Sequence, residues 1–128
     1  MITWAAGAVV VACGLFLLAF AVAMLTARAA SERFLRKFAS SARAHYAEQT
    51  LRLVAGAAFV LFASEMRYPL VFQVFGWILV VTAAVLMLLP WRWHQRFGAW
   101  AIPLAIRHMR LYAVGALALG GFVLWAAF

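Results

Sequence analysis

The basic residues of this 128-residue chain are not spread evenly along it. Ten of the eleven lysines and arginines lie in two segments, Arg28 to Arg52 and Arg92 to Arg110. Each segment is bounded on both sides by apolar runs that can cross a bilayer. Because positive charge beside a span is retained on the cytoplasmic side, this distribution predicts a multi-pass membrane protein with both basic segments inside and both termini outside.

Four apolar runs predict four transmembrane helices, at about residues 4–27, 48–67, 70–89 and 108–128. With 70% apolar and 11% charged residues, a soluble domain of this length could not bury its apolar surface. The second run is the shortest, so Arg52 must reach the headgroups along its aliphatic stem while Glu65 lies at the outer edge of the hydrocarbon. The expected fold is a single all-α membrane domain, residues 1–128, with four transmembrane helices in two hairpins.

Each basic segment predicts an amphipathic helix at the cytoplasmic membrane surface, at residues 31–46 and 91–102. An alternative for residues 31–46 is a cytoplasmic extension of the second span that packs on its neighbour. Pro103 either ends the second amphipathic helix or lies in the first turn of the last one. We expect six cations of these segments to hold anionic phospholipid headgroups: Arg36, Lys37, Arg43, Arg92, Arg96 and Arg107.

The two halves of the chain share short patterns. The spacing from Met24-Leu25 to Arg33-Phe34 equals that from Met87-Leu88 to Arg96-Phe97, and the surroundings of Gly56 resemble those of Gly115. These patterns predict a parallel internal repeat with a pseudo-two-fold axis along the membrane normal. The alternative is chance similarity between stretches rich in Ala, Leu and Arg.

The sequence offers little for catalysis. It contains no glycine-rich phosphate loop, no acid–base pair at a catalytic spacing and no zinc-binding spacing. The histidines, His45, His94 and His108, lie in the basic segments, where headgroup contacts account for them. We therefore expect a protein that is not an enzyme and carries no metal or other cofactor. Basic residues between aromatics also occur on nucleic-acid-binding surfaces, but the membrane accounts for both residue types here.

Two further groups are candidates for function. Glu65 is the only carboxylate near the outer side, and an acid close to the membrane core is a candidate ion or solute site, together with Gln73. Small residues on the last span predict a face for close helix packing: Gly115, Ala116, Gly120 and Gly121.

The expected function is that of an accessory subunit or scaffold in a membrane assembly, with lipid headgroups and other subunits or its own copies as partners. The preference for Arg over Lys is typical of a GC-rich bacterial genome, which predicts the bacterial inner membrane as the location. The alternative is a small oligomeric transporter or channel with Glu65 near an outer vestibule.

Overall fold

The computed structural model describes residues 2–38 and 41–128, and this part of the chain is helical without strands. The helices are α1 (Ile2–Thr26), α2 (Arg28–Phe38), α3 (Ala42–Phe62), the short 3₁₀ helix η1 (Ala63–Glu65), α4 (Pro69–Leu88), α5 (Trp91–Arg107) and α6 (Met109–Ala127). The expected all-α fold is confirmed. Helices α1, α4 and α6 are long and apolar enough to cross a membrane, which confirms a membrane protein with several spans.

Helix α3 does not meet the same criteria, because its first half carries Arg43, Glu48 and Arg52. Its apolar half begins only at Leu53, as the short second run of the sequence indicated. Length and composition alone therefore do not make α3 a fourth span.

The first amphipathic helix ends earlier than the sequence predicted. Helix α2 ends at Phe38, and Ser41 begins a new helix because its hydroxyl accepts a hydrogen bond from the Ala44 N–H at 3.1 Å. Residues 42–46 thus extend α3, and residues 39 and 40 of the predicted helix lie outside the described part. The second amphipathic helix is longer than predicted, since α5 continues through Pro103 to Arg107 and the chain bends at His108.

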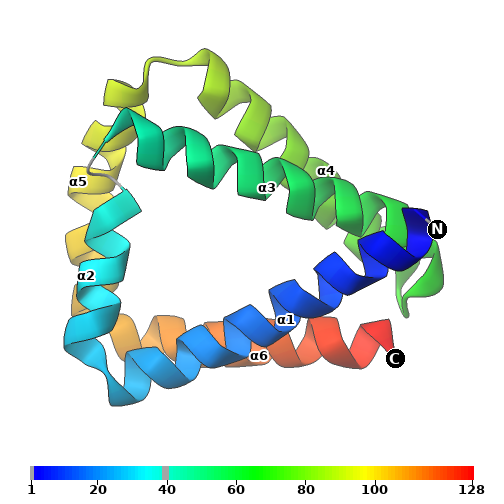
Figure 1. Ribbon diagram of the computed structural model, residues 1–128. Coiled ribbons are helices and arrows are strands. Elements are labelled where there is room, and N and C mark those ends of the chain that lie inside the picture. Colours follow the sequence, from blue (N-terminus) through cyan, green and yellow to red (C-terminus); the bar gives the residue numbers. More distant parts are fainter. Residues whose placement is uncertain (1, 39–40) are drawn as a thin grey trace.

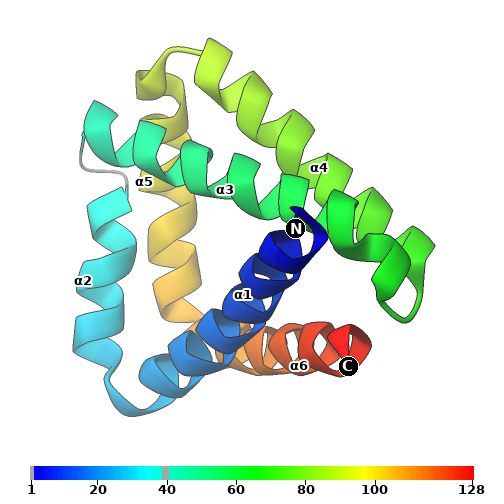
Figure 2. The same ribbon diagram turned by 45° about the vertical axis from the view of Figure 1, so that its right-hand side comes forward.

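The helices form a triangle (Figures 1 and 2). Helices α1 and α6 pack side by side as one arm, and α3 and α4 pack as the other. The arms meet at one end, here called the vertex, where both termini and the turn before α4 lie. They diverge toward α2 and α5, which run across the wide end and are here called the basic edge. The closest pairs therefore join the two halves of the chain, whereas the expected hairpins would pair helices within each half.

Each arm is held by a close approach of two glycines. A Cβ placed on Gly76 would lie 2.7 Å from the carbonyl oxygen of Gly56, and one placed on Gly120 would lie 3.0 Å from that of Gly14. Without side chains at these positions, the backbones of the paired helices come into contact. The α3–α4 arm is the more tightly packed of the two.

The vertex contains the larger apolar cluster. Phe72 of α4 stacks between Phe59 of α3, with ring centroids 6.0 Å apart, and Phe122 of α6, at 5.2 Å. The backbone N–H of Arg67 donates to the carbonyl of Ala126 at 2.9 Å, which ties the turn before α4 to the end of α6. These contacts hold the ends of both arms together.

The arrangement agrees with an internal repeat. An approximate two-fold rotation about the line from the vertex to the basic edge exchanges α1 with α4, α2 with α5 and α3 with α6 (Figures 1 and 2). Residues 63 positions apart then correspond, as His45 and His108 do. The glycines that meet in the two arms correspond under this offset to within one residue. The counterpart of Gly56 is therefore Gly120, and not Gly115.

Candidate functional site

The clearest polar site lies where α3, α4 and α5 meet, here called the His45 corner. His45 is 2% exposed, and both of its ring nitrogens have partners. Its Nδ1 lies 2.7 Å from Nδ1 of His94 on α5, and its Nε2 lies 3.1 Å from the carbonyl oxygen of Leu86 on α4. One buried imidazole therefore joins three helices.

Local sequence accounts for this geometry. The Ser41 cap places His45 in the first turn of α3. The Leu86 carbonyl would normally accept a hydrogen bond from the amide four residues later, but that residue is Pro90, which has no N–H. The imidazole of His45 supplies the missing donor. Pro90 also precedes α5, so that His94 lies in its first turns, facing His45.

The hydrogen bonds define the tautomers of the neutral pair. The Leu86 carbonyl can only accept, so Nε2 of His45 carries its hydrogen and Nδ1 is an acceptor. Nδ1 of His94 must therefore donate to it. This assignment leaves Nε2 of His94 as the unprotonated nitrogen of the pair.

Nearby charges act on His94. Burial lowers the pKa of His94 below its ordinary value, Glu48 raises it, and His45 and Arg52 lower it further. Glu48 and Arg52 are themselves joined by a 3.1 Å ion pair one turn apart on α3. The net effect keeps His94 neutral at a pH where an exposed histidine would begin to bind a proton.

Two buried polar side chains have no hydrogen-bond partner within the described part of the chain. Gln49, one turn after His45 on the same face of α3, is fully buried, and neither atom of its amide group is bonded. Ser31 on α2 is 3% exposed, and its hydroxyl is also unpaired. Under the offset of 63, Ser31 corresponds to His94, so equivalent places in the two halves of the chain carry different polar groups.

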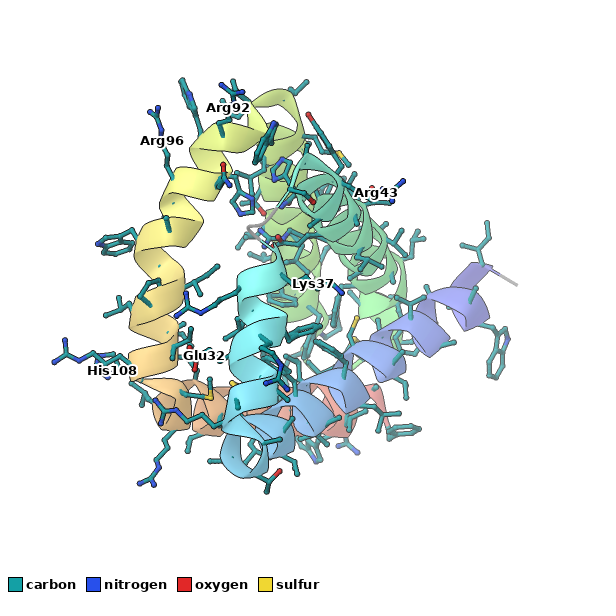
Figure 3. All side chains as sticks on the ribbon, turned by 60° about the vertical axis from the view of Figure 1, so that its left-hand side comes forward. Glu32, Lys37, Arg43, Arg92, Arg96 and His108 are labelled. Carbon is teal, nitrogen blue, oxygen red and sulfur yellow. The ribbon has the colours of Figure 1, made fainter. Side chains whose placement is uncertain are left out.

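The histidines do not behave alike. The sequence predicted headgroup contacts for all three, but His45 is enclosed by protein and His94 is bonded to it. His108 is exposed and projects outward at the end of α5 (Figure 3). Histidine spacing could not reveal the pair, because 49 residues separate its members. No group of three or more His, Cys, Asp or Glu in the described part could hold a metal ion.

The six predicted headgroup cations are exposed, and all lie on α2, α5 or the start of α3. In Figure 3 Arg92 and Arg96 project outward from α5, whereas Lys37 lies on α2 and Arg43 at the start of α3. Arg36 forms an ion pair with Glu32 at 3.2 Å. Arg28, outside the predicted set, donates to the Ile106 carbonyl at 2.8 Å and fastens α2 to α5.

Glu65 is exposed at the vertex, at the end of η1. It lines an open, largely apolar groove of about 900 Å³ together with Trp4, Phe62 and Phe128. The guanidinium of Arg67, two residues after Glu65, lies over the Trp125 ring, 4.9 Å from its centroid. Gln73 is exposed on α4 and is not among the described residues that line this groove.

The small residues of α6 fall into two groups. Gly120 packs on α1, and Ala116 packs beside Met24, Met109 and Ala113. A methyl group added at Gly115 or Gly121 would meet no atom of another helix within 4 Å in the described part of the chain. These two glycines remain available to a helix from outside the chain.

Comparisons of the chain with known protein families, with curated proteins and with solved structures find no match.

Proposed function

We propose that the protein is a non-enzymatic subunit or scaffold of a membrane assembly, inserted with the basic edge at the cytoplasmic surface and the vertex on the outer side. The location we propose is the bacterial inner membrane, with α3 as the fourth span. Arg52 would then lie near the cytoplasmic headgroups, where its ion pair with Glu48 lowers the cost of its position.

The open triangle carries this proposal. In the most apolar stretches of α1, α4 and α6, only 17% to 28% of the residues are buried within the chain. Helices α4 and α6 each have one close helical partner, and α1 packs on α6 and, at the vertex, on α3. Between the two arms no further helix of the described chain is present (Figure 1). A thin, splayed unit with uncovered apolar helices suits packing against other membrane helices.

The direct test is extraction from native membranes in a mild detergent or a lipid-preserving polymer. A larger membrane protein that copurifies at fixed stoichiometry is the expected result, and a defined homo-oligomer also fits a scaffold. A stable monomer without partners would contradict the proposal. Gly121→Leu should weaken the association while the chain itself still folds, because Gly121 meets no other part of the described chain.

Anionic phospholipid is the second partner in this proposal. The six predicted cations are exposed and lie on α2, α5 or the start of α3, and cations at the headgroup level attract anionic lipid at about 1 kcal/mol each. Changing Arg36, Lys37 and Arg43 to Gln should reduce copurified anionic lipid. Unchanged lipid content would mean that this segment packs on protein.

The groove at Glu65 supports the alternative, a small transporter or channel. It is apolar, open and lined by one carboxylate, as an entrance for a cationic or protonated solute would be. Glu65→Gln distinguishes the two functions. A scaffold should assemble normally with this change, whereas a transporter should lose solute flux in liposomes without losing its fold.

A further inference from the structure

The His45–His94 pair has a use that neither a scaffold nor the Glu65 groove requires. An isolated buried histidine needs only one or two hydrogen bonds, and an apolar side chain would fill the same space without a desolvation cost. Here two imidazoles face each other across a 2.7 Å contact between α3 and α5. The equivalent place in the other half has Ser31 and His108, which form no such bond.

The bonding pattern limits how many protons the pair can take. The first added proton binds Nε2 of His94, because this nitrogen carries no hydrogen and accepts no hydrogen bond from the pair. Of the other three ring nitrogens, two carry a hydrogen and the third accepts a hydrogen bond. Both existing hydrogen bonds survive this addition. A second proton would have to bind Nδ1 of His45, where it would point at the N–H of His94 and break the contact between the rings.

We propose that the His45–His94 pair is a binding site for a single proton, and that its occupation weakens the docking of α5 on α3 and α4. The inference is independent of the subunit and transport functions discussed above.

The groups around His94 determine whether proton binding strengthens or weakens the docking of α5. Docking partly buries the His94 ring and places it against the His45 ring and near Arg52, so a positive charge on it is less stable there than in water. This lowers the pKa of docked His94, and undocked α5 therefore binds the proton more tightly. Docking is therefore strongest above the ordinary histidine pKa of about 6.5 and weakens as the pH falls below it. In the described part of the chain few other contacts hold α5 against α3 and α4, so a positive charge on the docked His94 ring should affect the position of the whole helix.

The charged and titratable groups around the pair are few. Helix α3 contributes Glu48 and Arg52, and the Tyr46 ring lies edge-on to His45. Helix α4 contributes only the Leu86 carbonyl, because it has no ionisable side chain. On α5 itself, Arg92 and Arg96 point outward (Figure 3), and α2 carries Glu32, Arg33, Arg36 and Lys37.

Gln49 is consistent with this assignment. Its amide is fully buried one turn from His45 and has no partner within the described part of the chain. An amide that is free to reorient can turn its oxygen toward a positive charge that appears nearby.

The first test counts protons. The full chain, labelled with ¹⁵N-histidine in nanodiscs of phosphatidylcholine, is titrated from pH 8 to pH 4.5 and its ring nitrogens are followed by NMR. We expect the His45–His94 pair to take up one proton in a single step, and the signals of His108, which is outside the pair, serve as an internal reference. Two independent protons on His45 and His94 would overturn the proposal, as would tight binding of added Zn²⁺ by the pair.

The second test follows docking. In a Cys13→Ser background, spin labels at Ala47 on α3 and Ala99 on α5 report the distance between these helices. We expect the distance distribution to lengthen and broaden below about pH 6.5. His94→Gln keeps a side-chain N–H donor for His45 but cannot titrate, so it should abolish the change, whereas His108→Gln should retain it.

An equal response of His94→Gln and wild type would overturn the coupling between the proton and docking. If His94→Gln fails to fold, the proton count on the wild-type chain still decides whether the site exists.

Discussion

The repeat relates the His45 corner to a second place in the fold, here called the His108 corner. Different side chains fill these two corners. At the His108 corner, where α6, α1 and α2 meet, Met24, Met109 and Ala113 form an apolar cluster joined by Leu35 and Phe20. At the His45 corner, a histidine pair, a carbonyl and a buried glutamine occupy the corresponding space. At the His108 corner Ser31 contributes a single buried hydroxyl, so a corner of this triangle can close without a histidine pair or a buried amide.

Replacing His45 tests this comparison with the largest expected effect. His45→Ala leaves the Leu86 carbonyl and the His94 N–H without partners, and each such group costs about 1–3 kcal/mol. We expect the free energy of unfolding to fall by about 2–6 kcal/mol from these two groups, and the cavity adds to the loss. His108→Ala, the matched control, should stay within about 0.5 kcal/mol of wild type. Equal effects in denaturant titrations of the two variants would remove the distinction between the corners.

Alanine substitutions at the glycine contacts test how closely the helices of each arm pack. In Gly76→Ala the new methyl group would meet the Gly56 carbonyl oxygen and the backbone of Val60 below 3 Å, and overpacking of this kind costs about 1–3 kcal/mol. Gly120→Ala should cost less, since its nearest contacts are at 3.0 Å. Gly115→Ala adds a methyl group to open space and serves as the control. The same unfolding titrations should rank the three variants in this order, and a larger loss for Gly120→Ala would reverse our assignment of the tighter arm.

Replacing the buried polar groups that have no partner should give the smallest changes in the free energy of unfolding, and these changes should be stabilising. Gln49→Leu removes an unpaired buried amide, and we expect a gain in stability of about 1–2 kcal/mol. Ser31→Ala at the His108 corner removes only one hydroxyl and should gain less. If Gln49→Leu destabilises the protein instead, the amide has a structural partner, and its proposed freedom to reorient near His94 is wrong.

Sequence reasoning could predict the helical membrane fold, because apolar run length and basic clusters act locally along the chain. It could also suggest the repeat, whose spacing is visible in Met24 and Met87. It missed the pairing of α1 with α6 and of α3 with α4, which depends on where Gly14, Gly56, Gly76 and Gly120 meet across the chain. The small residues of the last span indicated Gly120 as a packing position, but no local pattern shows which helix it meets.

The candidate site was harder to predict than the fold. The residues of the basic edge were found because charge and amphipathicity are periodic. The His45–His94 bond was missed, because it depends on a carbonyl that Pro90 leaves free and on the angle at which α5 crosses α3. The correspondence of His45 with His108 at an offset of 63 was the one available signal that a histidine occupies a defined place in each half.

The proposed orientation places the vertex and the basic edge on opposite sides of the membrane, with the basic edge inside. In a Cys13→Ser background, single cysteines at Ser64 near the vertex and at Ala99 on α5 are exposed, conservative sites for labelling. With intact cells and a membrane-impermeant thiol reagent, we expect Ser64→Cys to react and Ala99→Cys to react only after the membrane is opened. Reaction of Ala99→Cys in intact cells, or protection of Ser64→Cys, would contradict the account.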